Sequence, residues 1–288
     1  MLSRIRDSIL KLSKRANIAK ALSYFLAHIW PLAHIFPFYP TKVKIDGLTL
    51  YLHPRDPGSI TIALGMHKPF MTEVFKRVVR KGYIVVDIDA HIGYYSLLAA
   101  KLVGEGGKVY AFEPEPRNYE LLLKNIKLND MDKIIIPVRK AVLNENTVIK
   151  LYLTKTSQWH SIHKGARYIN VEAITLDHFL TLRGDLTVNV VKVDTLGGEP
   201  LVFLGMEKIL DYNRNIKIFT MFIPQRYERL NISPLGFLNW MSEKGFSIHY
   251  IDEDRKLLVP ISTSILREFV EVAQEEGICI FISEETDN

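Results

Sequence analysis

Three acidic residues, Asp87, Glu113 and Asp194, each come directly after an apolar run of the kind that forms a buried strand. Glu113 lies twenty positions after Gly93, which is the distance needed to cross one helix and return on a neighbouring parallel strand. A carboxylate at that edge of a sheet can bind the two hydroxyls of a ribose. The helix that begins after Gly93 can hold an anionic group at its N-terminus. The spacing therefore predicts a nucleoside-binding site.

These side chains need a strand–helix–strand–helix unit to hold them together. Strands are expected at 83–86 and 108–112 and helices at 94–103 and 116–128, and the tight turn 87–93 joins the first strand to the first helix. Parallel strands with a crossover helix bring the carboxyl ends of both strands to the same edge of the sheet.

The remaining pattern continues the alternation of strands and helices. Further strands are expected at 42–45, 48–52, 134–138, 148–153, 171–175, 186–193, 216–223, 246–251 and 278–282, and further helices at 71–80, 200–210, 234–244 and 265–274. The pattern predicts an α/β fold in which helices cover both faces of a mostly parallel sheet. No Gly/Ser-rich linker divides it, so one domain, 41–288, is expected after an N-terminal arm, 1–40.

The composition excludes several classes of protein. A hydrophobic content of 48% with 24% charged residues is that of a globular chain, and the charge of +5 is only mildly basic. The single cysteine, Cys279, excludes an internal disulfide framework and a cysteine-based zinc cluster. His160 and His163 lack a nearby acid or thiol, so no metal site is expected. Nucleic-acid binding is not expected either, because no recognised module accompanies the basic residues.

The N-terminal arm has a character of its own. Residues 1–20 carry six basic side chains against one acid, and residues 21–40 are rich in aromatics and broken by Pro31, Pro37 and Pro40. These prolines argue against a membrane span, and no small-residue cleavage site supports a signal peptide. Two interpretations remain: the arm lies on an anionic membrane surface, or it packs as a helix on its own domain or a partner. The expected location is cytoplasmic, with a peripheral position on the inner membrane face under the first interpretation.

Seven short segments carry a resemblance to a known family. They are Lys81–Asp87, Ile92–Ser96, Ala111–Pro114, Asn125–Asn129, Val191–Asp194, Gly197–Glu199 and Leu204–Met206. Together they resemble the FkbM-type family of S-adenosylmethionine-dependent methyltransferases. The resemblance implies a class I, Rossmann-like methyltransferase fold with S-adenosylmethionine as the cofactor. It also implies O-methylation of a hydroxyl on a sugar, lipid-linked (glycolipid) or natural-product acceptor.

The resemblance and the spacing together give the residues of the cofactor side. Asp87 would anchor the loop and face the amino group of the methionine part, and Gly93 would let the helix begin close to the ligand. Glu113 would bind the ribose, or, in the plainer alternative, cap the end of a strand in contact with solvent. Ala141, after the third strand, would flank the adenine.

Three residues make up the expected catalytic side. Asp194 would orient the acceptor hydroxyl or its proton, and Lys192 and Glu199 belong to the same matching block. The alternative for Asp194 is that its side chain caps the following helix.

Four positions depart from the family pattern. The family has glycine where this chain has Asp89, asparagine where it has His91, glutamate where it has Leu196, and commonly an acid near Met221. Asp89 is the most serious departure, because its carboxylate would stand in the cofactor site and repel the cofactor's own carboxylate. Two like charges ~4 Å apart cost roughly 4 kcal/mol at an effective dielectric constant of about 20. Protonation, a turn of the side chain toward solvent, or capping of the following helix by Asp89 would reduce this cost.

Two functions therefore compete. The chain is either an active methyltransferase with an adjusted cofactor loop or a catalytically silent relative that serves as a binding or scaffolding module, with a membrane surface as one place for it. A nicotinamide-dependent dehydrogenase is a poor third candidate, because the turn 87–93 lacks the glycine fingerprint of a dinucleotide site.

Overall fold

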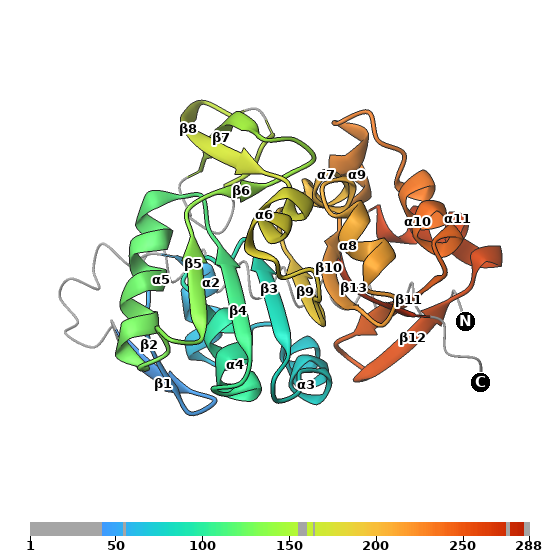
Figure 1. Cartoon of the computed structure of the whole chain (residues 1–288). Coiled ribbons are helices and arrows are strands. Elements are labelled where there is room, and N and C mark those ends of the chain that lie inside the picture. Colours follow the sequence, from blue (N-terminus) through green and yellow to red (C-terminus); the bar gives the residue numbers. More distant parts are fainter. Residues whose placement is uncertain (1–41, 54–55, 155–159, 164, 275–276, 285–288) are drawn as a thin grey trace, which may run out of the picture.

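The computed structural model describes residues 42–53, 56–154, 160–163, 165–274 and 277–284. The predicted arm, 1–40, lies outside these described residues. Within them, helices cover both faces of a central sheet, and a small second sheet stands beyond one edge of it (Figure 1). The prediction of an α/β fold with a mostly parallel sheet is confirmed.

The central sheet is the scaffold of the molecule. Its strands, in spatial order, are β12 (Leu257–Ile261), β11 (Phe246–Asp252), β13 (Ile278–Glu284), β10 (Lys217–Phe222), β9 (Val190–Val193), β3 (Ile84–Ile88), β4 (Lys108–Phe112) and β5 (Ile135–Val138). The five strands from β10 to β5 are parallel, and β13, β11 and β12 extend them through antiparallel pairings. The carboxyl ends of β3, β4 and β9 therefore meet at one edge, as expected for the three acidic residues.

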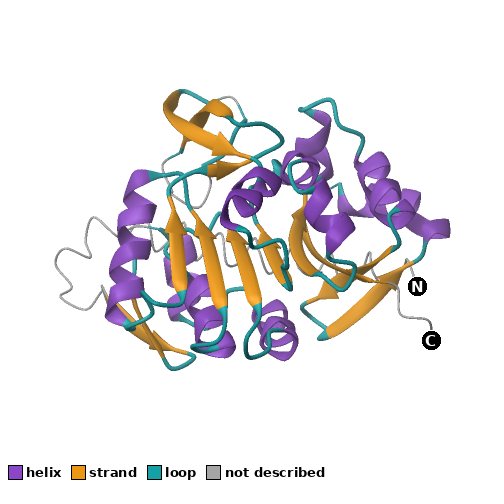
Figure 2. Ribbon diagram, viewed as in Figure 1, coloured by secondary structure: helices purple, strands orange, loops and turns teal. Residues whose placement is uncertain are grey.

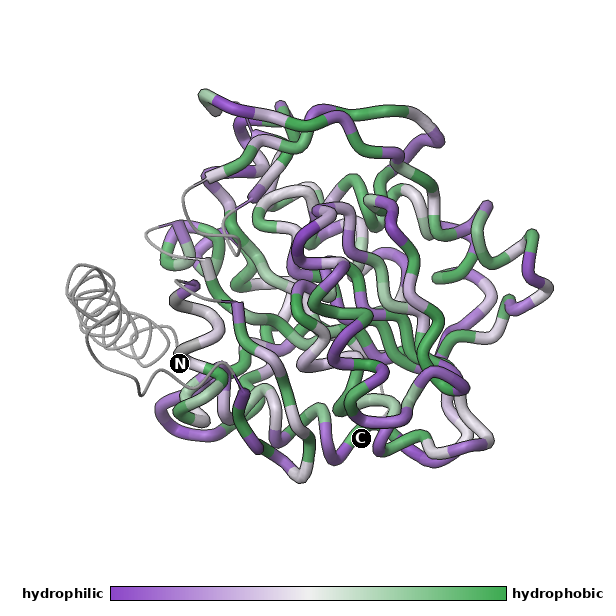
Figure 3. Tube along the Cα trace, turned by 90° about the vertical axis from the view of Figure 1, so that its left-hand side faces the viewer, coloured by the Kyte–Doolittle hydropathy of each residue, from purple (hydrophilic) through white to green (hydrophobic). Residues whose placement is uncertain are grey.

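Two hydrophobic clusters separate the two faces of the sheet. On one face, residues such as Val85 and Val109 pack against the hairpin β1 (Lys42–Ile45) and β2 (Leu48–Tyr51) and against α2 (Pro57–Ala63), α3 (Pro69–Val78), α4 (Tyr94–Val103) and α5 (Pro116–Leu128). On the other, Val86 and Tyr110 pack against α6 (Leu176–Arg183), α7 (Glu199–Leu204), α8 (Glu207–Tyr212), α9 (Pro224–Glu228), α10 (Pro234–Glu243) and α11 (Leu266–Ala273). The helices flank the strands in Figure 2, and hydrophobic segments run through the middle of the molecule in Figure 3.

The predicted strand–helix–strand–helix unit is present with few changes. Helix α4, strand β4 and helix α5 have the predicted bounds, and β3 ends at Ile88, two residues later than predicted. Glu115 is the N-cap of helix α5: its side chain accepts a hydrogen bond from the backbone N–H of Asn118 at 2.7 Å, and Pro116 takes the first helical position. Because β3 is longer, Asp87 lies inside the strand and Asp89 is the first residue after it.

The hairpin is fixed to α5 by two asparagine side chains. The side-chain oxygen of Asn125 accepts from the N–H of Tyr51 at 2.6 Å, and its amide donates to the Tyr51 carbonyl at 3.0 Å. Asn129 makes the same two bonds with Thr49, at 2.9 and 2.7 Å. Asn125 also donates to the carbonyl of Ile92 at 2.8 Å. The hairpin is thus tied to the loop that follows β3.

A three-stranded sheet lies beyond the carboxyl ends of β4 and β5 (Figure 1). It contains β6 (Ala141–Val142), β7 (Thr147–Leu153) and β8 (Arg167–Ile174). The prediction of strands at 148–153 and 171–175 is confirmed in place, although β8 begins four residues earlier than predicted.

Several expectations about the second half of the chain are wrong in detail. The helix predicted at 200–210 is two helices, because the chain breaks at Gly205, where an added Cβ would lie 1.9 Å from the carbonyl oxygen of Leu143. The segment Pro224–Glu228, where no helix was predicted, forms α9, and its Tyr227 is fully buried. Helices α2 and α6 and strand β12 were not predicted. None of the helices in the described part of the chain is long and apolar enough to cross a bilayer.

Candidate functional site

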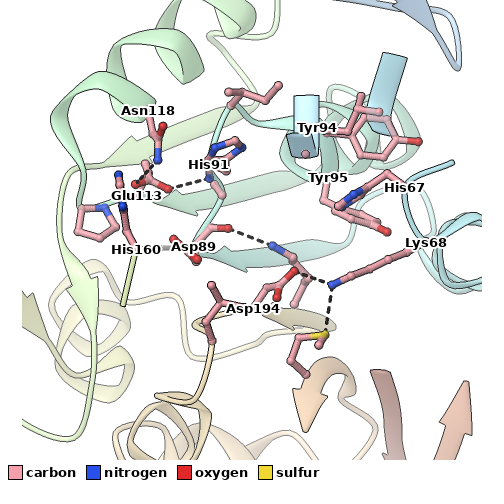
Figure 4. A pocket seen from close by; sticks show the side chains of 18 of the residues that line it. His67, Lys68, Asp89, His91, Tyr94, Tyr95, Glu113, Asn118, His160 and Asp194 are labelled. Atoms are coloured by element: carbon pink, nitrogen blue, oxygen red, sulfur yellow. Dashed lines mark hydrogen bonds and ion pairs between the residues drawn. The ribbon is translucent and has the colours of Figure 1, made fainter. Parts of the chain in front are cut away.

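A cavity of about 200 Å³ opens at the edge where β3, β4 and β9 end (Figure 4). Of the predicted site residues, it is lined by Asp89, His91, Glu113, Lys192 and Asp194. The loop after β3, the end of β4, the strand β9 and the starts of α3 and α4 contribute to its wall. The topology therefore brings residues from more than 100 positions apart to one place.

Glu113 is held at the cavity by a set of donors. It is 1% exposed, and it accepts hydrogen bonds from the backbone N–H groups of His91 at 2.8 Å and Glu115 at 2.9 Å. The side-chain amide of Asn118 lies 3.5 Å from the same carboxyl group. Burial, followed by the neighbouring Asp89, raises the pKa of Glu113 well above its usual range. Glu113 is thus a fixed acceptor at the end of β4, as a ribose ligand must be.

Asp89 is partly exposed and lies directly beside Glu113. Its side chain is hydrogen-bonded to Glu113, and burial raises the pKa of Asp89 to about 7, with Lys192 acting in the opposite sense. It is not the N-cap residue of the next helix, because Gly93 takes that position in α4. Of the placements considered for Asp89, the structure therefore contradicts capping of the helix and shows a carboxyl pair with Glu113 instead.

Three of the four departures from the family pattern share an unusual backbone conformation. Asp89, His91 and Leu196 have φ angles of 63°, 53° and 53°, in the left-handed region. Glycine and asparagine, the family residues at the first two positions, tolerate this region best. Aspartate and histidine enter this region more readily than most residues, whereas leucine does so at a cost of roughly 1–2 kcal/mol.

Asp87 and Lys192 form a buried ion pair beneath the cavity. Their charged atoms lie 3.1 Å apart, and their side chains are 2% and 5% exposed. Asp87 also accepts a hydrogen bond from the hydroxyl of Ser96 at 2.6 Å, in the first turn of α4. Lys192 donates to the backbone carbonyl of Asp89 at 3.0 Å. Burial lowers the pKa of Lys192, but Asp87 and Asp194 outweigh it, so the pKa is raised.

This arrangement changes the role expected for Asp87. The residue does not line the cavity, so its carboxylate does not face a ligand's amino group there. It holds Lys192 and the start of α4, and in this way it anchors the loop, which was the other half of the prediction.

Asp194 is paired with Lys68, which was not among the predicted site residues. The ammonium of Lys68 lies 2.7 Å from its carboxylate and 3.3 Å from the sulfur of Met221. Burial opposes ionisation, but Lys68 and Lys192 outweigh it and lower the pKa of Asp194 to about 2. Asp194 is therefore an ionised carboxylate that can accept a hydrogen bond from a hydroxyl but is a weak base.

Aromatic and imidazole side chains complete the cavity near Asp194. They are His67, Tyr94 and Tyr95, with His160 on the opposite wall. Burial lowers the pKa of His67 to about 3, so its ring is neutral. In the sequence, this wall was indicated only by Tyr94 and Tyr95. Both lie in the first turn of α4, directly after the predicted ligand loop 87–93. No group of three or more potential metal ligands occurs among the residues that the structure describes.

Besides Asp87, three more predicted residues do not line this cavity. An added Cβ at Gly93 would lie 2.5 Å from a methyl carbon of Leu122, so this glycine lets α5 approach and does not make room for a ligand. Glu199 is fully buried, accepts from the N–H of Gly197 at 2.8 Å, and has its pKa raised to about 8 by burial. It is a buried, protonated group that stabilises its own loop. Ala141 lines an adjoining cavity.

The adjoining cavity is smaller and mostly apolar. It shares Asp89, Pro114, Leu151 and His160 with the first cavity, and its other walls include Ile88, Phe112, Ala141, Val142 and Leu143. Such walls suit the faces of an adenine, and the position beside Glu113 suits a purine attached to the ribose. Its volume of about 40 Å³ has room for only a few water molecules, so a purine has to move part of the wall.

Comparison with known proteins gives a family. The family model described as the methyltransferase FkbM domain matches residues 87–248. No curated protein sequence matches the chain.

Solved structures give distant similarities only. An rRNA methylase from Streptococcus thermophilus is 14% identical with a TM-score of 0.44, over 75% of this chain and 95% of that one. Methyltransferase FkbM from Methylobacillus flagellatus KT is 14% identical with a TM-score of 0.41, over 78% and 54%. A SAM-dependent methyltransferase from Aquifex aeolicus is 11% identical with a TM-score of 0.43, over 78% and 96%.

Proposed function

Because this chain belongs to the FkbM family of S-adenosylmethionine-dependent methyltransferases, with their class I Rossmann-like fold, we propose that it methylates a hydroxyl group. The acceptor would be a sugar, a lipid-linked (glycolipid) molecule or a natural product. One observation carries the proposal: a single cavity is lined by Glu113 at the end of β4 and by Asp194 after β9. A ligand for a nucleoside and a ligand for a hydroxyl thus share one enclosed space.

The chain's residues fit the cofactor in two parts. Glu113, held by backbone N–H groups, would accept hydrogen bonds from the ribose hydroxyls, and the apolar cavity around Ala141 would take the adenine. Lys192 fixes the backbone of Asp89 and so sets the shape of the loop between these two parts. When bound, S-adenosylmethionine supplies a methyl group made electrophilic by the sulfonium sulfur.

Asp194 would position the acceptor. Because Lys68 keeps it ionised, its carboxylate can accept the hydrogen bond of a hydroxyl and orient the oxygen. Methyl transfer from a sulfonium makes a modest demand on deprotonation, so alignment of the two reactants in the cavity can supply much of the rate. The neutral His67 ring, a weak base, can accept a hydrogen bond from the hydroxyl but not its proton.

A catalytically silent binding or scaffolding module is the second candidate. Three observations favour it. The carboxylate of Asp194 is already paired with Lys68, and Leu196 stands where the family has a glutamate. Glu113 is likewise already bonded to Asp89. A ligand has to replace these internal contacts before it can bind.

Calorimetric titration with S-adenosylmethionine distinguishes the two candidates. We expect the unaltered chain to bind, and Asp89→Gly to bind about tenfold more tightly at pH 6, where Asp89 is mostly protonated, because this change removes the carboxyl group that occupies Glu113. Asp130→Gly is the matched control, since Asp130 also has a positive φ, 54°, but is exposed and does not line the cavity. Binding by the unaltered chain refutes the silent module in its strong form. Absence of binding by both the chain and Asp89→Gly refutes methyl transfer.

For the arm, 1–40, we propose contact with an anionic membrane surface, supported by its six basic residues among the first 20 and the aromatic segment after them. The full chain is expected to float with vesicles that contain phosphatidylserine and not with neutral vesicles. A chain without residues 1–40 is expected to remain in the soluble fraction in both cases. If the deletion leaves flotation unchanged, the membrane proposal fails and packing of the arm on its own domain or a partner is favoured.

A further inference from the structure

Asp89 is the one charged residue of the cavity to which the proposed reaction gives no role. It lines both the main cavity and the apolar cavity, so it stands where they join. Its side chain bonds to Glu113, and its backbone carbonyl accepts from Lys192. It therefore lies between the residue for the ribose and the strand that leads to Asp194.

This position has a chemical meaning for a methyl donor. The sulfur of the cofactor is attached to the ribose, and its methyl group has to reach the acceptor. The sulfur must therefore lie between the ribose ligand and the acceptor side, which is where Asp89 stands. The sulfur is positively charged in S-adenosylmethionine and uncharged in the product, S-adenosylhomocysteine.

We propose that the Asp89 side chain makes this cavity selective for the charged sulfonium of the donor over the uncharged thioether of the product. The inference rests on the proposed function and deepens it, because it assigns a role to a residue for which the family has glycine. The two ligands carry the same carboxylate, amino group and nucleoside, so any repulsion between Asp89 and the ligand's carboxylate cancels in the comparison. What remains is the single charge on sulfur.

The other charged groups around Asp89 are already balanced in pairs. Lys192 on β9 is paired with Asp87 on β3, and Asp194 after β9 is paired with Lys68 at the start of α3. Glu113 at the end of β4 is held by N–H donors and interacts with Asp89, but it faces the ribose, which is the same in both ligands, so its own titration cancels in the comparison. Burial lowers the pKa of His91, on the loop after β3, and of His160, on the opposite wall. Asp89 is thus the group whose charge is left to respond to a ligand.

The selectivity should depend on pH. Burial raises the pKa of Asp89 to about 7, so the side chain is mostly protonated below neutral pH and mostly ionised above it. An ionised carboxylate near a sulfonium attracts it by at least about tenfold in affinity, while a protonated carboxyl group does not. The preference for the donor over the product should therefore rise as the pH rises through 7.

The test is calorimetric titration of the full chain with S-adenosylmethionine and S-adenosylhomocysteine, at pH 6 and at pH 7.5. The ratio of the two dissociation constants is expected to change by about fivefold between these pH values in favour of the donor. In Asp89→Asn the ratio is expected to be independent of pH. Asparagine is nearly isosteric, has no charge at either pH, and tolerates the left-handed conformation at this position.

The outcomes separate this inference from the proposed function. If both ligands bind and their ratio does not change with pH, or if Asp89→Asn shows the same change, the role of Asp89 is refuted while the cofactor site stands. If neither ligand binds to the chain or to the variant, both proposals are refuted. A thermal unfolding midpoint of Asp89→Asn within a few degrees of that of the chain shows that the comparison is made on folded protein.

Discussion

Replacement of Lys192 by methionine is expected to lower the free energy of unfolding by about 3–5 kcal/mol. Methionine fills a similar volume but leaves the carboxylate of Asp87 buried without its cation, since both side chains of this pair are 5% exposed or less. The hydroxyl of Ser96 remains as a partner, but it does not compensate for a full charge. Urea denaturation followed by circular dichroism measures the loss.

The chain offers a matched control for this variant. Lys68→Met also removes a lysine from an aspartate, but Lys68 and Asp194 are each about one-fifth exposed, so solvent screens the remaining charge. We expect a loss of about 1 kcal/mol or less. Addition of Asp87→Asn to Lys192→Met should recover part of the larger loss, because it removes the unpaired charge. Equal effects of Lys192→Met and Lys68→Met would contradict the buried pair as a centre of stability.

The second large effect is expected at Glu113. In Glu113→Gln the affinity for S-adenosylmethionine should fall by at least about 100-fold. Two charge-assisted hydrogen bonds to a ribose, each about 1.5–3 kcal/mol, become weaker neutral ones or are lost. The N–H groups of His91 and Glu115 bond to different oxygens of Glu113, so the single amide oxygen of glutamine keeps one of these two bonds. Calorimetric titration measures the affinity, and thermal unfolding checks the fold.

Glu115→Gln is the control for this variant. Glu115 lies two positions after Glu113 and is also buried. Its side chain caps α5 and does not line the cavity. Glutamine there keeps an oxygen for the N–H of Asn118, so affinity should be unchanged. Retention of full affinity in Glu113→Gln would mean that the ribose is not held at the end of β4, and the assignment of the site would have to be abandoned.

The place of the site could be predicted from the sequence because it depends on local patterns. An apolar run that ends in an acid, followed by a helix of small apolar residues, specifies where the carboxyl end of a parallel strand lies. This reasoning placed Glu113 and Asp194 at one edge of the sheet, and the structure has both in one cavity. It also placed Asp87 at that edge, but β3 continues past Asp87 to Ile88, and Asp87 is therefore buried beneath the cavity.

The partners of these residues could not be predicted in the same way. Lys68 and Asp194 are 126 positions apart and meet only because α3 packs at the carboxyl edge of β9. Nothing in the sequence around Lys68 distinguishes it from an ordinary lysine before a helix. The pairing of Asp89 with Glu113 was missed for another reason. The sequence pattern indicates that Asp89 would repel a ligand's carboxylate, but it does not show that the carboxyl group of Glu113 lies beside Asp89.

The two asparagines that hold the hairpin have a consequence for how the chain behaves among its own copies. Positions four apart on a helix are about 6 Å apart along its axis, close to the roughly 6.6 Å between alternate residues of a strand. Asn125 and Asn129 can therefore pair with Tyr51 and Thr49 as the next strand of a sheet would. An unpaired strand recruits other chains and promotes aggregation. The edge of β2 that faces α5 therefore cannot pair with a strand of another chain, because Asn125 and Asn129 already bond to its backbone.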